Sequence, residues 1–282
     1  MSLFEQLSEK DPKIIDNFLE SLSEDDLEIL LTDFIFRAHD YQIEPEGNHT
    51  TWLLMGGRGS GKTRAGCEAV IHAARYENAR HIALVGENIS DVLSVMVHGE
   101  SGIINCAPDD FKPTLKRSEN YLIFPNGAKA SFFSSNDPDS LRGPQFHFAW
   151  CDELAKWRYP QETWDNLQMA LRLGENPRQI VTTTPRPRPL LHNIKEDLDT
   201  ICTHATTYQN AKNLAPKFMD NILKKYDKTR YGRQEIYGEL LSGHDGALWS
   251  REGLDKIRIP PSQRPDYFER IVIGVDLSLI HI

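Results

Sequence analysis

Hydrophobic and polar positions along the chain predict helices at its N-terminal end. Asp11 followed by Pro12 is typical of a helix cap with a proline in the first turn, and Ser23 with Asp26 resembles a capping box. Apolar residues then recur at helical spacing, at Leu27, Leu30, Leu31, Phe34 and Ile35. This pattern predicts two short amphipathic helices, whose apolar face packs against the body of the protein or docks a separate partner.

From Trp52 onward, apolar runs alternate with helical stretches. Strands are predicted at TWLLM, HIALVGE, HFAW and QIVTTT, and helices over residues 62–75, 89–97 and 216–241. Two further runs, YLIF and AKASFF, flank the turn Pro125-Asn126-Gly127, which is a strong hairpin signal. Because this alternation is typical of βαβ units, the sequence predicts an α/β fold with a mainly parallel sheet.

Composition and charge narrow the class of protein. The 282 residues include 32 Lys plus Arg and 41 Asp plus Glu, ordinary values for a soluble globular chain. No run approaches the roughly 20 apolar residues of a membrane span, and the acidic start is no signal peptide, so a cytoplasmic protein is expected. Residues 1–48 hold 13 acids and 3 bases, and the rest is nearly neutral, which leaves a nucleic-acid partner possible. Four cysteines stand too far apart for a zinc or CxxC motif and are expected to be reduced: Cys67, Cys106, Cys151 and Cys202.

A glycine-rich segment carries the first candidate chemistry. Residues 56–63 read GGRGSGKT, which fits G-x-x-x-x-G-K-[ST], directly after a predicted strand and at the start of a predicted helix. Glycines let backbone amides turn toward phosphate oxygens, Lys62 would reach the β and γ phosphates of ATP, and Thr63 would offer its hydroxyl to Mg²⁺. An accidental glycine-rich turn is the alternative. The predicted nucleotide-binding residues here are Gly56, Gly57, Arg58, Gly59, Ser60, Gly61, Lys62 and Thr63.

A second candidate is the acidic pair that ends HFAWCDE. Nucleotide hydrolysis needs a carboxylate for the metal and, in many ATPases, a second one to activate water. The apolar run delivers Asp152 and Glu153 to the carboxyl end of a strand, where ligands collect in open α/β sheets. Asp152 would hold Mg²⁺ and Glu153 would act as the base, unless the two acids are only a surface pair.

Several segments, in this order, resemble the large terminase subunit, the genome-packaging motor of tailed bacteriophages. The resemblance runs from Arg37 and Gln42 through the P-loop, residues 140–143, WCDE and TTTPRP to YGELLSGHDGALWS. It implies a P-loop NTPase of the ASCE type that uses ATP and Mg²⁺ and acts on double-stranded DNA. It also implies a portal protein and a small terminase subunit as partners, a homo-oligomeric ring, and the cytoplasm of a bacterial host.

The resemblance also assigns roles to matching residues. Gln42 occupies the place of a glutamine that contacts adenine, and a solvated loop residue is the alternative. Arg58 matches an arginine that senses the γ phosphate within its own subunit, and Arg142 matches one that reaches the nucleotide of a neighbouring subunit, although an ordinary surface role is possible for both. The family's coupling motif, which links the γ-phosphate state to movement, falls on Thr182, Thr183 and Thr184, where threonine is also a common strand residue.

The end of the chain resembles the start of the family's second domain, an RNase H-like nuclease. Residues 273–276 read IGVD, and Asp276 would be its first metal ligand, but only six residues follow. Because a two-metal nuclease needs further carboxylates, this site is expected to be incomplete, without endonuclease activity, in a truncated chain. The expected domains are N-terminal helices over 1–36, an ATPase domain over 37–245, a linker over 246–269 and the nuclease start over 270–282.

The sequence therefore favours an ATP-hydrolysing motor subunit that moves double-stranded DNA into a procapsid. Two alternatives stay open, a helicase-like nucleic-acid translocase and a nucleotide-binding fragment without productive turnover. A small-molecule kinase fits less well, because the acidic pair and the late threonines suit hydrolysis better than transfer to a metabolite. The sequence does not decide whether Arg186, Arg188 and the bases of residues 224–233 contact DNA or form solvated surface.

Overall fold

The computed structural model describes residues 10–24, 26–27, 30, 33–227 and 229–241, together with Leu7 and Arg258. Its internal contacts divide the chain into two units, Met1–Leu241 and Ser242–Ile282, and the fold below is that of the first. Asp276 lies outside the described residues, and so does the expected linker, of which only Arg258 is described. The expected domain boundaries therefore stay predictions.

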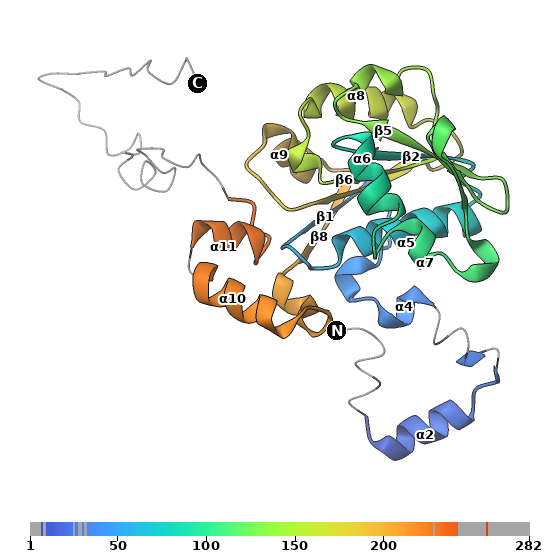
Figure 1. Ribbon diagram of the computed structural model, residues 1–282, viewed down its shortest axis with the longest axis vertical. Helices are drawn as coiled ribbons and strands as arrows, with labels where there is room; N and C mark the ends of the chain where they lie inside the picture. Colours follow the sequence, from blue (N-terminus) through green and yellow to red (C-terminus); the bar gives the residue numbers. More distant parts are fainter. Residues whose placement is uncertain are drawn as a thin grey trace, which may run out of the picture. The chain divides into compact units, whose positions relative to one another are not determined.

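The first unit is built on an eight-stranded sheet in the order β3-β4-β5-β2-β6-β7-β1-β8 (Figure 1). The strands from β5 to β8 in this order pair in parallel, whereas β4 pairs antiparallel with both β3 and β5. This arrangement confirms the predicted mainly parallel sheet and the hairpin at Pro125-Asn126-Gly127. The strands are β1 (Thr51–Gly56), β2 (His81–Gly86), β3 (Thr114–Lys116), β4 (Tyr121–Ile123), β5 (Lys129–Ser134), β6 (Phe148–Asp152), β7 (Arg178–Thr183) and β8 (Thr200–Ala205).

Helices cover both faces of the sheet, with α5 and α7 on one side and α8 and α9 on the other (Figure 1). The α-helices are α2 (Pro12–Glu20), α4 (Phe34–Arg37), α5 (Lys62–Tyr76), α6 (Ile89–Asp91), α7 (Ile103–Cys106), α8 (Pro160–Ala170), α9 (Pro189–Glu196), α10 (Pro216–Tyr226) and α11 (Arg230–Glu235). The other helical turns are η1 (Asp40–Gln42), the π-helical η2 (Val92–Val97), η3 (Asp109–Phe111), η4 (Arg117–Glu119), η5 (Pro138–Leu141), η6 (Leu154–Lys156) and η7 (Thr207–Asn213).

Two layers of buried side chains hold the helices to the sheet. Alternate residues of β1 serve opposite layers, since Trp52 and Leu54 belong to the layer under α5, whereas Leu53 and Met55 belong to the layer under α8 and α9. On the first face α5 approaches closely, because a Cβ on Gly66 would lie 2.2 Å from the indole of Trp150. A side chain at Gly66 would therefore push α5, and the loop before it, away from the sheet.

The N-terminal caps were predicted correctly, but the apolar stripe was not one helix. The carboxylate of Asp11 accepts the amide of Lys13 at 2.9 Å, and the amide of Asp26 donates to the hydroxyl of Ser23 at 3.1 Å. Asp33 caps a new helix by accepting the amide of Ile35 at 2.9 Å. Because α4 has its own start, Phe34 and Ile35 do not continue the stripe of the preceding leucines.

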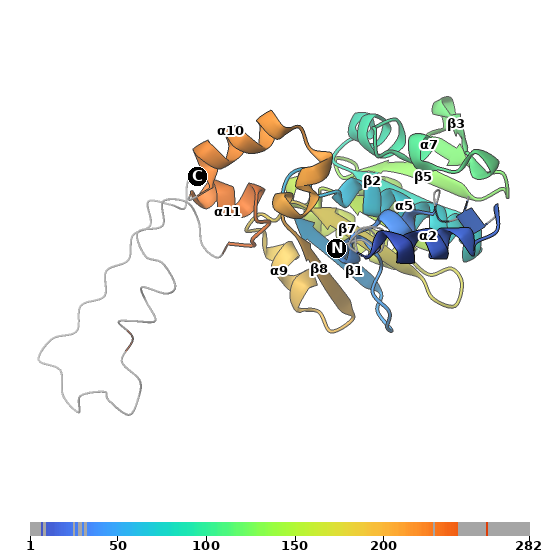
Figure 2. The same cartoon turned by 90° about the horizontal axis from the view of Figure 1, so that it is seen from below.

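The helix predicted over 89–97 is confirmed in its extent, since α6 covers residues 89–91 and the π-helical η2 continues to Val97. The helix predicted over 216–241 was wrong in its extent. The segment 216–241 divides into α10 and α11, because Thr229 starts a second helix by accepting the amide of Gly232 at 3.0 Å. The described residues after Glu235 leave the helix and return to the glycine-rich loop, where a Cβ on Gly238 would lie 2.8 Å from the backbone of Gly56 and Gly57. Figure 2 shows α10 and α11 side by side at this end of the sheet.

Candidate active site

The glycine-rich loop joins the end of β1 to the start of α5, as the sequence predicts. Gly59 and Gly61 have φ angles of +73° and +85°, which disfavour any side chain. Gly57 meets a steric limit instead, because a Cβ there would lie 2.3 Å from the carbonyl oxygen of Ile236. Among the residues that the structure describes, the amides of Gly59 and Gly61 have no acceptor. These two N–H groups are therefore free for phosphate oxygens.

Lys62, the first residue of α5, is folded back into the loop. Its Nζ donates to the carbonyls of Gly56 and Gly57 at 3.0 and 2.8 Å. Burial lowers the pKa of this ammonium, and the carboxylates of Glu153, Asp152 and Glu235 oppose the shift. A buried cation held by two carbonyls can exchange them for phosphate oxygens. Thr63 follows in the first turn of α5 and is partly buried.

The two acids of the sequence prediction stand at the same edge of the sheet, at the end of β6. Only β7 separates β6 from β1 in the sheet. Burial, with the nearby charge of Glu153, raises the pKa of Asp152 to about 7. Its Oδ1 accepts the Thr182 hydroxyl at 2.7 Å, and that hydroxyl also accepts the indole N–H of Trp150 at 2.8 Å. A buried carboxylate with this fixed orientation is a fitting ligand for a hard cation.

Glu153 follows the strand with an unusual backbone. Its φ is +49°, which is rare for a residue with a side chain and is typical of functional sites. The position is held by its own amide, which donates to the Thr182 carbonyl at 2.7 Å. Its carboxylate accepts the amide and the hydroxyl of Thr184 at 3.3 and 3.4 Å. The carboxylate is therefore oriented by Thr184, the residue that follows β7.

Two of the three threonines contact the acidic pair, and the third contacts the turn that follows it. Thr182 bonds Asp152, and Thr184 bonds Glu153. The Thr183 hydroxyl instead accepts the amide of Ala155 at 3.1 Å, in the turn η6 that follows the acids. A movement of Glu153 or Asp152 would therefore displace the threonines at the end of β7 that are bonded to them.

The three long polar side chains assigned by resemblance all have partners in this chain. Arg58 Nε lies 3.4 Å from the carboxylate of Glu235 in α11. Arg142 follows η5, is largely exposed, and contacts Asp139 at 3.2 Å and the side chain of Asn166 at 3.3 Å. Gln42 is buried and its Nε2 donates to the carbonyl of Gly61 at 3.0 Å.

Residues from the segment after β8 belong to the site, and the sequence analysis missed them. Glu235 faces Arg58, and its backbone carbonyl accepts the Arg58 amide at 2.6 Å. The Thr207 hydroxyl donates to the Arg58 carbonyl, and Asn210 donates to the Gly59 carbonyl, both at 2.8 Å. No motif marks these positions in the sequence. Thr207, Asn210 and Glu235 lie far from the P-loop in the sequence, and only the folded structure brings them to it.

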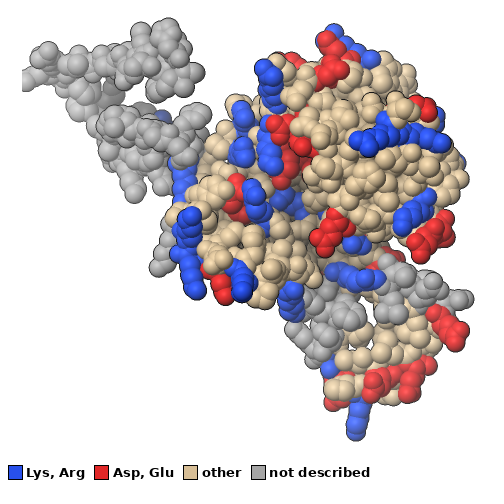
Figure 3. All heavy atoms as spheres, in the orientation of Figure 1, with Lys and Arg blue, Asp and Glu red and all other residues tan. Residues whose placement is uncertain are grey.

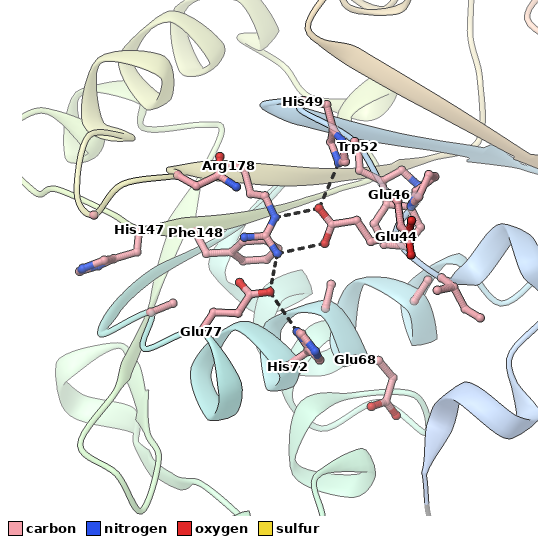
Figure 4. Close-up of a pocket in the computed structure, with 18 of the residues that line it drawn as sticks. Glu44, Glu46, His49, Trp52, Glu68, His72, Glu77, His147, Phe148 and Arg178 are labelled. Carbon is pink, nitrogen blue, oxygen red and sulfur yellow. Dashed lines mark hydrogen bonds and ion pairs between the residues drawn. The ribbon is translucent and has the colours of Figure 1, made fainter.

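A cavity of about 780 Å³ runs along α5 toward the edge where the strands begin. Its wall holds an ion-pair network (Figure 4) in which Arg178 contacts Glu44 at 2.8 Å and Glu77 at 2.6 Å. Although burial acts in the opposite direction, hydrogen bonds from His72 and Arg178 lower the pKa of Glu77 to about 2. The network ties the segment before β1 to the start of β7. It lies beside the strand starts, whereas the P-loop and the acids stand at the strand ends.

Basic side chains gather over α10 and α11, interspersed with acids (Figure 3). Lys224 and Lys225 end α10, and Arg230 and Arg233 belong to α11. Arg233 contacts Glu239 at 2.6 Å, so part of this charge is paired within the chain. Lys228 lies outside the described residues.

The fold and the site together define a P-loop nucleotide-binding protein of the α/β class, with a phosphate loop on β1 and paired acids on β6. The family described as "Terminase large subunit, T4likevirus-type, N-terminal" matches residues 53–256, and the chain belongs to that family. The family suggested by the motifs is thereby confirmed. A comparison with curated proteins finds no match.

Solved structures of large terminases share the fold at low sequence identity. The ATPase domain of the large terminase of Thermus phage P74-26 is 17% identical, with a TM-score of 0.56 over 78% of this chain and 98% of that one. A large terminase from a thermophilic bacteriophage, in complex with ADP, is 16% identical, with a TM-score of 0.57 over 78% of this chain and 53% of that one. The bacteriophage HK97 large terminase is 19% identical, with a TM-score of 0.53 over 73% of this chain and 49% of that one.

This chain thus spans about half the length of the latter two proteins. Within the described residues, no helix combines the length and the apolar character needed to cross a membrane.

Proposed function

We propose that this chain is the ATP-hydrolysing motor part of a phage large terminase, which moves double-stranded DNA into a procapsid. The observation that carries the proposal is the meeting of the P-loop and the Asp152–Glu153 pair at one edge of the sheet. The buried ammonium of Lys62 interacts with the charges of both carboxylates. Membership of the terminase family gives the hydrolysis its setting in DNA packaging. The portal protein and the small terminase subunit are the proposed partners, and a homo-oligomeric ring is the proposed assembly.

The residues at the site suit ATP with Mg²⁺. Asp152 and the Thr63 hydroxyl would hold the ion, and Mg²⁺ bound there would neutralise charge on the phosphates during transfer. The amides of Gly59 and Gly61 and the Lys62 ammonium bind and orient the phosphates. Glu153 accepts a proton from the attacking water, since Thr184 aims its carboxylate and no basic side chain contacts it among the described residues.

The arginines and threonines supply the coupling in this proposal. Arg58 would leave Glu235 for the γ phosphate, because a fully charged phosphate attracts a guanidinium more strongly than one carboxylate at 3.4 Å. Thr184 would sense the new position of Glu153 and pass it along β7. Gln42 is the family's adenine contact, and taking that role here would require its amide to leave Gly61.

Packaging is tested by DNA protection. Purified chain is mixed with portal-bearing empty capsids, the small subunit, linear double-stranded DNA and Mg²⁺-ATP, and the DNA that survives added DNase is measured. Protected DNA is expected with ATP and not with a non-hydrolysable analogue. ATP turnover with strand separation of a partial duplex and no protection would support a helicase-like translocase instead. Binding without turnover would leave only a nucleotide-binding fragment.

Arg142 is proposed to act on the nucleotide of a neighbouring subunit, because its side chain is largely exposed and its contacts among the described residues are to Asp139 and Asn166. Arg142→Ala subunits keep an intact P-loop, and Lys62→Ala subunits keep the arginine. A mixture of the two is therefore expected to recover ATP turnover that neither has alone. Adding the double variant Lys62→Ala/Arg142→Ala in place of Lys62→Ala should abolish the recovery. Absence of any recovery at assembling concentrations would reject action between subunits.

A further inference from the structure

Four consecutive carbonyls of the P-loop each receive a hydrogen bond from a side chain outside the loop. The Thr207 hydroxyl donates to Arg58 O at 2.8 Å and Asn210 Nδ2 donates to Gly59 O at 2.8 Å. The Tyr41 hydroxyl donates to Ser60 O at 3.0 Å and Gln42 Nε2 donates to Gly61 O at 3.0 Å. Two donors come from η1, before β1, and two from η7, after β8. The loop is thus held from both sides by what we call the carbonyl collar, Tyr41, Gln42, Thr207 and Asn210.

The collar fixes the direction of the loop amides through the geometry of the peptide group. In a trans peptide the carbonyl of one residue and the amide of the next point in opposite directions, and the described chain has no cis peptide. Holding the carbonyls of residues 58–61 outward therefore turns the amides of residues 59–61 and of Lys62 toward the inside of the loop. Those amides include Gly59 and Gly61, which have no acceptor among the described residues.

The collar side chains are themselves held in place. Gln42 Oε1 accepts the amide of His39 at 3.0 Å, which leaves its Nε2 to face Gly61. Asn210 Oδ1 accepts the side-chain amide of Asn213 at 2.7 Å, and the backbone of Thr207 is anchored to Ile236. Tyr41, Gln42 and Thr207 are buried, with relative exposures of 8%, 7% and 1%. Donors with so little freedom preorganise the groups they bond.

We propose that the carbonyl collar positions the P-loop amides for the phosphates, so that Thr207 and Asn210 set phosphate affinity without touching the nucleotide. The inference rests on the proposed function, since it assumes that the loop binds a polyphosphate. Successive inward amides form an anion-binding concavity, and fixing them beforehand removes an ordering cost from binding. Thr207 and Asn210 act on the phosphates and are indifferent to the base, whereas Gln42 would leave the carbonyl of Gly61 to contact adenine.

The test compares Mg²⁺-ATP with inorganic triphosphate, which has no base or ribose, by titration calorimetry. Thr207→Val keeps the shape of the side chain and removes the donor, and Asn210→Leu does the same at a partly exposed position. Each is expected to weaken both ligands by the same factor, about 3- to 10-fold, the size of one lost hydrogen bond. Thr207→Ser keeps the hydroxyl and should restore wild-type affinity. Thr114→Val, the matched control, removes an exposed hydroxyl on β3, at the opposite edge of the sheet from β8, and should change neither affinity.

Three results would contradict either the collar proposal or the proposed function. A loss with ATP but not with triphosphate would overturn the proposal, because it would place Thr207 or Asn210 against the base or ribose. Unchanged affinities in both variants would also overturn it. If Thr207→Val does not fold, Asn210→Leu decides alone. Failure of the wild-type chain to bind either ligand would count against the proposed function itself, and so the two failures are distinguishable.

Discussion

Lys62→Ala is expected to abolish measurable ATP turnover, with a fall of at least about 10²- to 10³-fold. The Nζ of Lys62 lies inside the P-loop, bonded to the carbonyls of Gly56 and Gly57, so it is placed where phosphate oxygens would replace them. Its charge also interacts with those of Asp152 and Glu153. Removing it leaves developing phosphate charge opposite two acids. Phosphate release measured with Mg²⁺-ATP gives the rate.

A neighbouring lysine provides the matched control for this variant. Lys156, in η6, lies near enough to Asp152 to act on its charge, but it is exposed and outside the loop. Lys156→Ala is therefore expected to change turnover by no more than a few-fold, as for other solvent-screened charges. Circular dichroism would show that both variants are folded. Equal losses of turnover in the two variants would mean that any nearby positive charge supports hydrolysis, whatever its position. Turnover retained in Lys62→Ala would reject the assignment of the P-loop.

The P-loop and the acidic pair could be predicted because each is encoded locally. A strand, a glycine-rich turn and a helix follow one another within residues 51–76, and the acids follow their strand directly. The parallel sheet then brings the two motifs to one edge without further information, since the carboxyl ends of parallel strands meet there. Asp152 and Glu153 stand at the end of β6, which β7 alone separates from β1, and the three strands run parallel.

The carbonyl collar and Glu235 could not be predicted in the same way. Thr207 and Asn210 lie 149 and 151 residues from the carbonyls that they bond. Their function depends on a donor being in the right place, and threonine or asparagine in a polar turn is too common to indicate it. The division of the segment 216–241 was hidden for a related reason. The residues on both sides of Thr229 form helices, and the second helix begins with the hydroxyl of Thr229 as its cap.

Glu153→Gln is expected to keep ATP binding and to lower turnover by about 10²- to 10⁴-fold, the usual contribution of a positioned general base. The amide can reproduce the contacts of the acid, because its oxygen can accept the Thr184 amide and its nitrogen can donate to the Thr184 hydroxyl. The backbone at φ +49° is the same for both residues. The variant therefore removes the proton acceptor while keeping the shape of the site. Single-turnover hydrolysis and equilibrium binding of Mg²⁺-ATP separate the two effects, and Glu162→Gln in α8 is an exposed control.

The same variant should also change how the site responds to pH. Burial is the largest cause of the raised pKa of Asp152, about 7, and the charge of Glu153 is the second. Since Mg²⁺ needs the deprotonated carboxylate, metal affinity of the wild-type chain should rise as the pH increases through 7. Without the charge of Glu153 the pKa of Asp152 falls, so the rise in Mg²⁺ affinity should occur at lower pH. Mg²⁺ titrations at pH 6 and 8 check this, and an unshifted pH dependence combined with unchanged turnover would show that Glu153 is not part of the site.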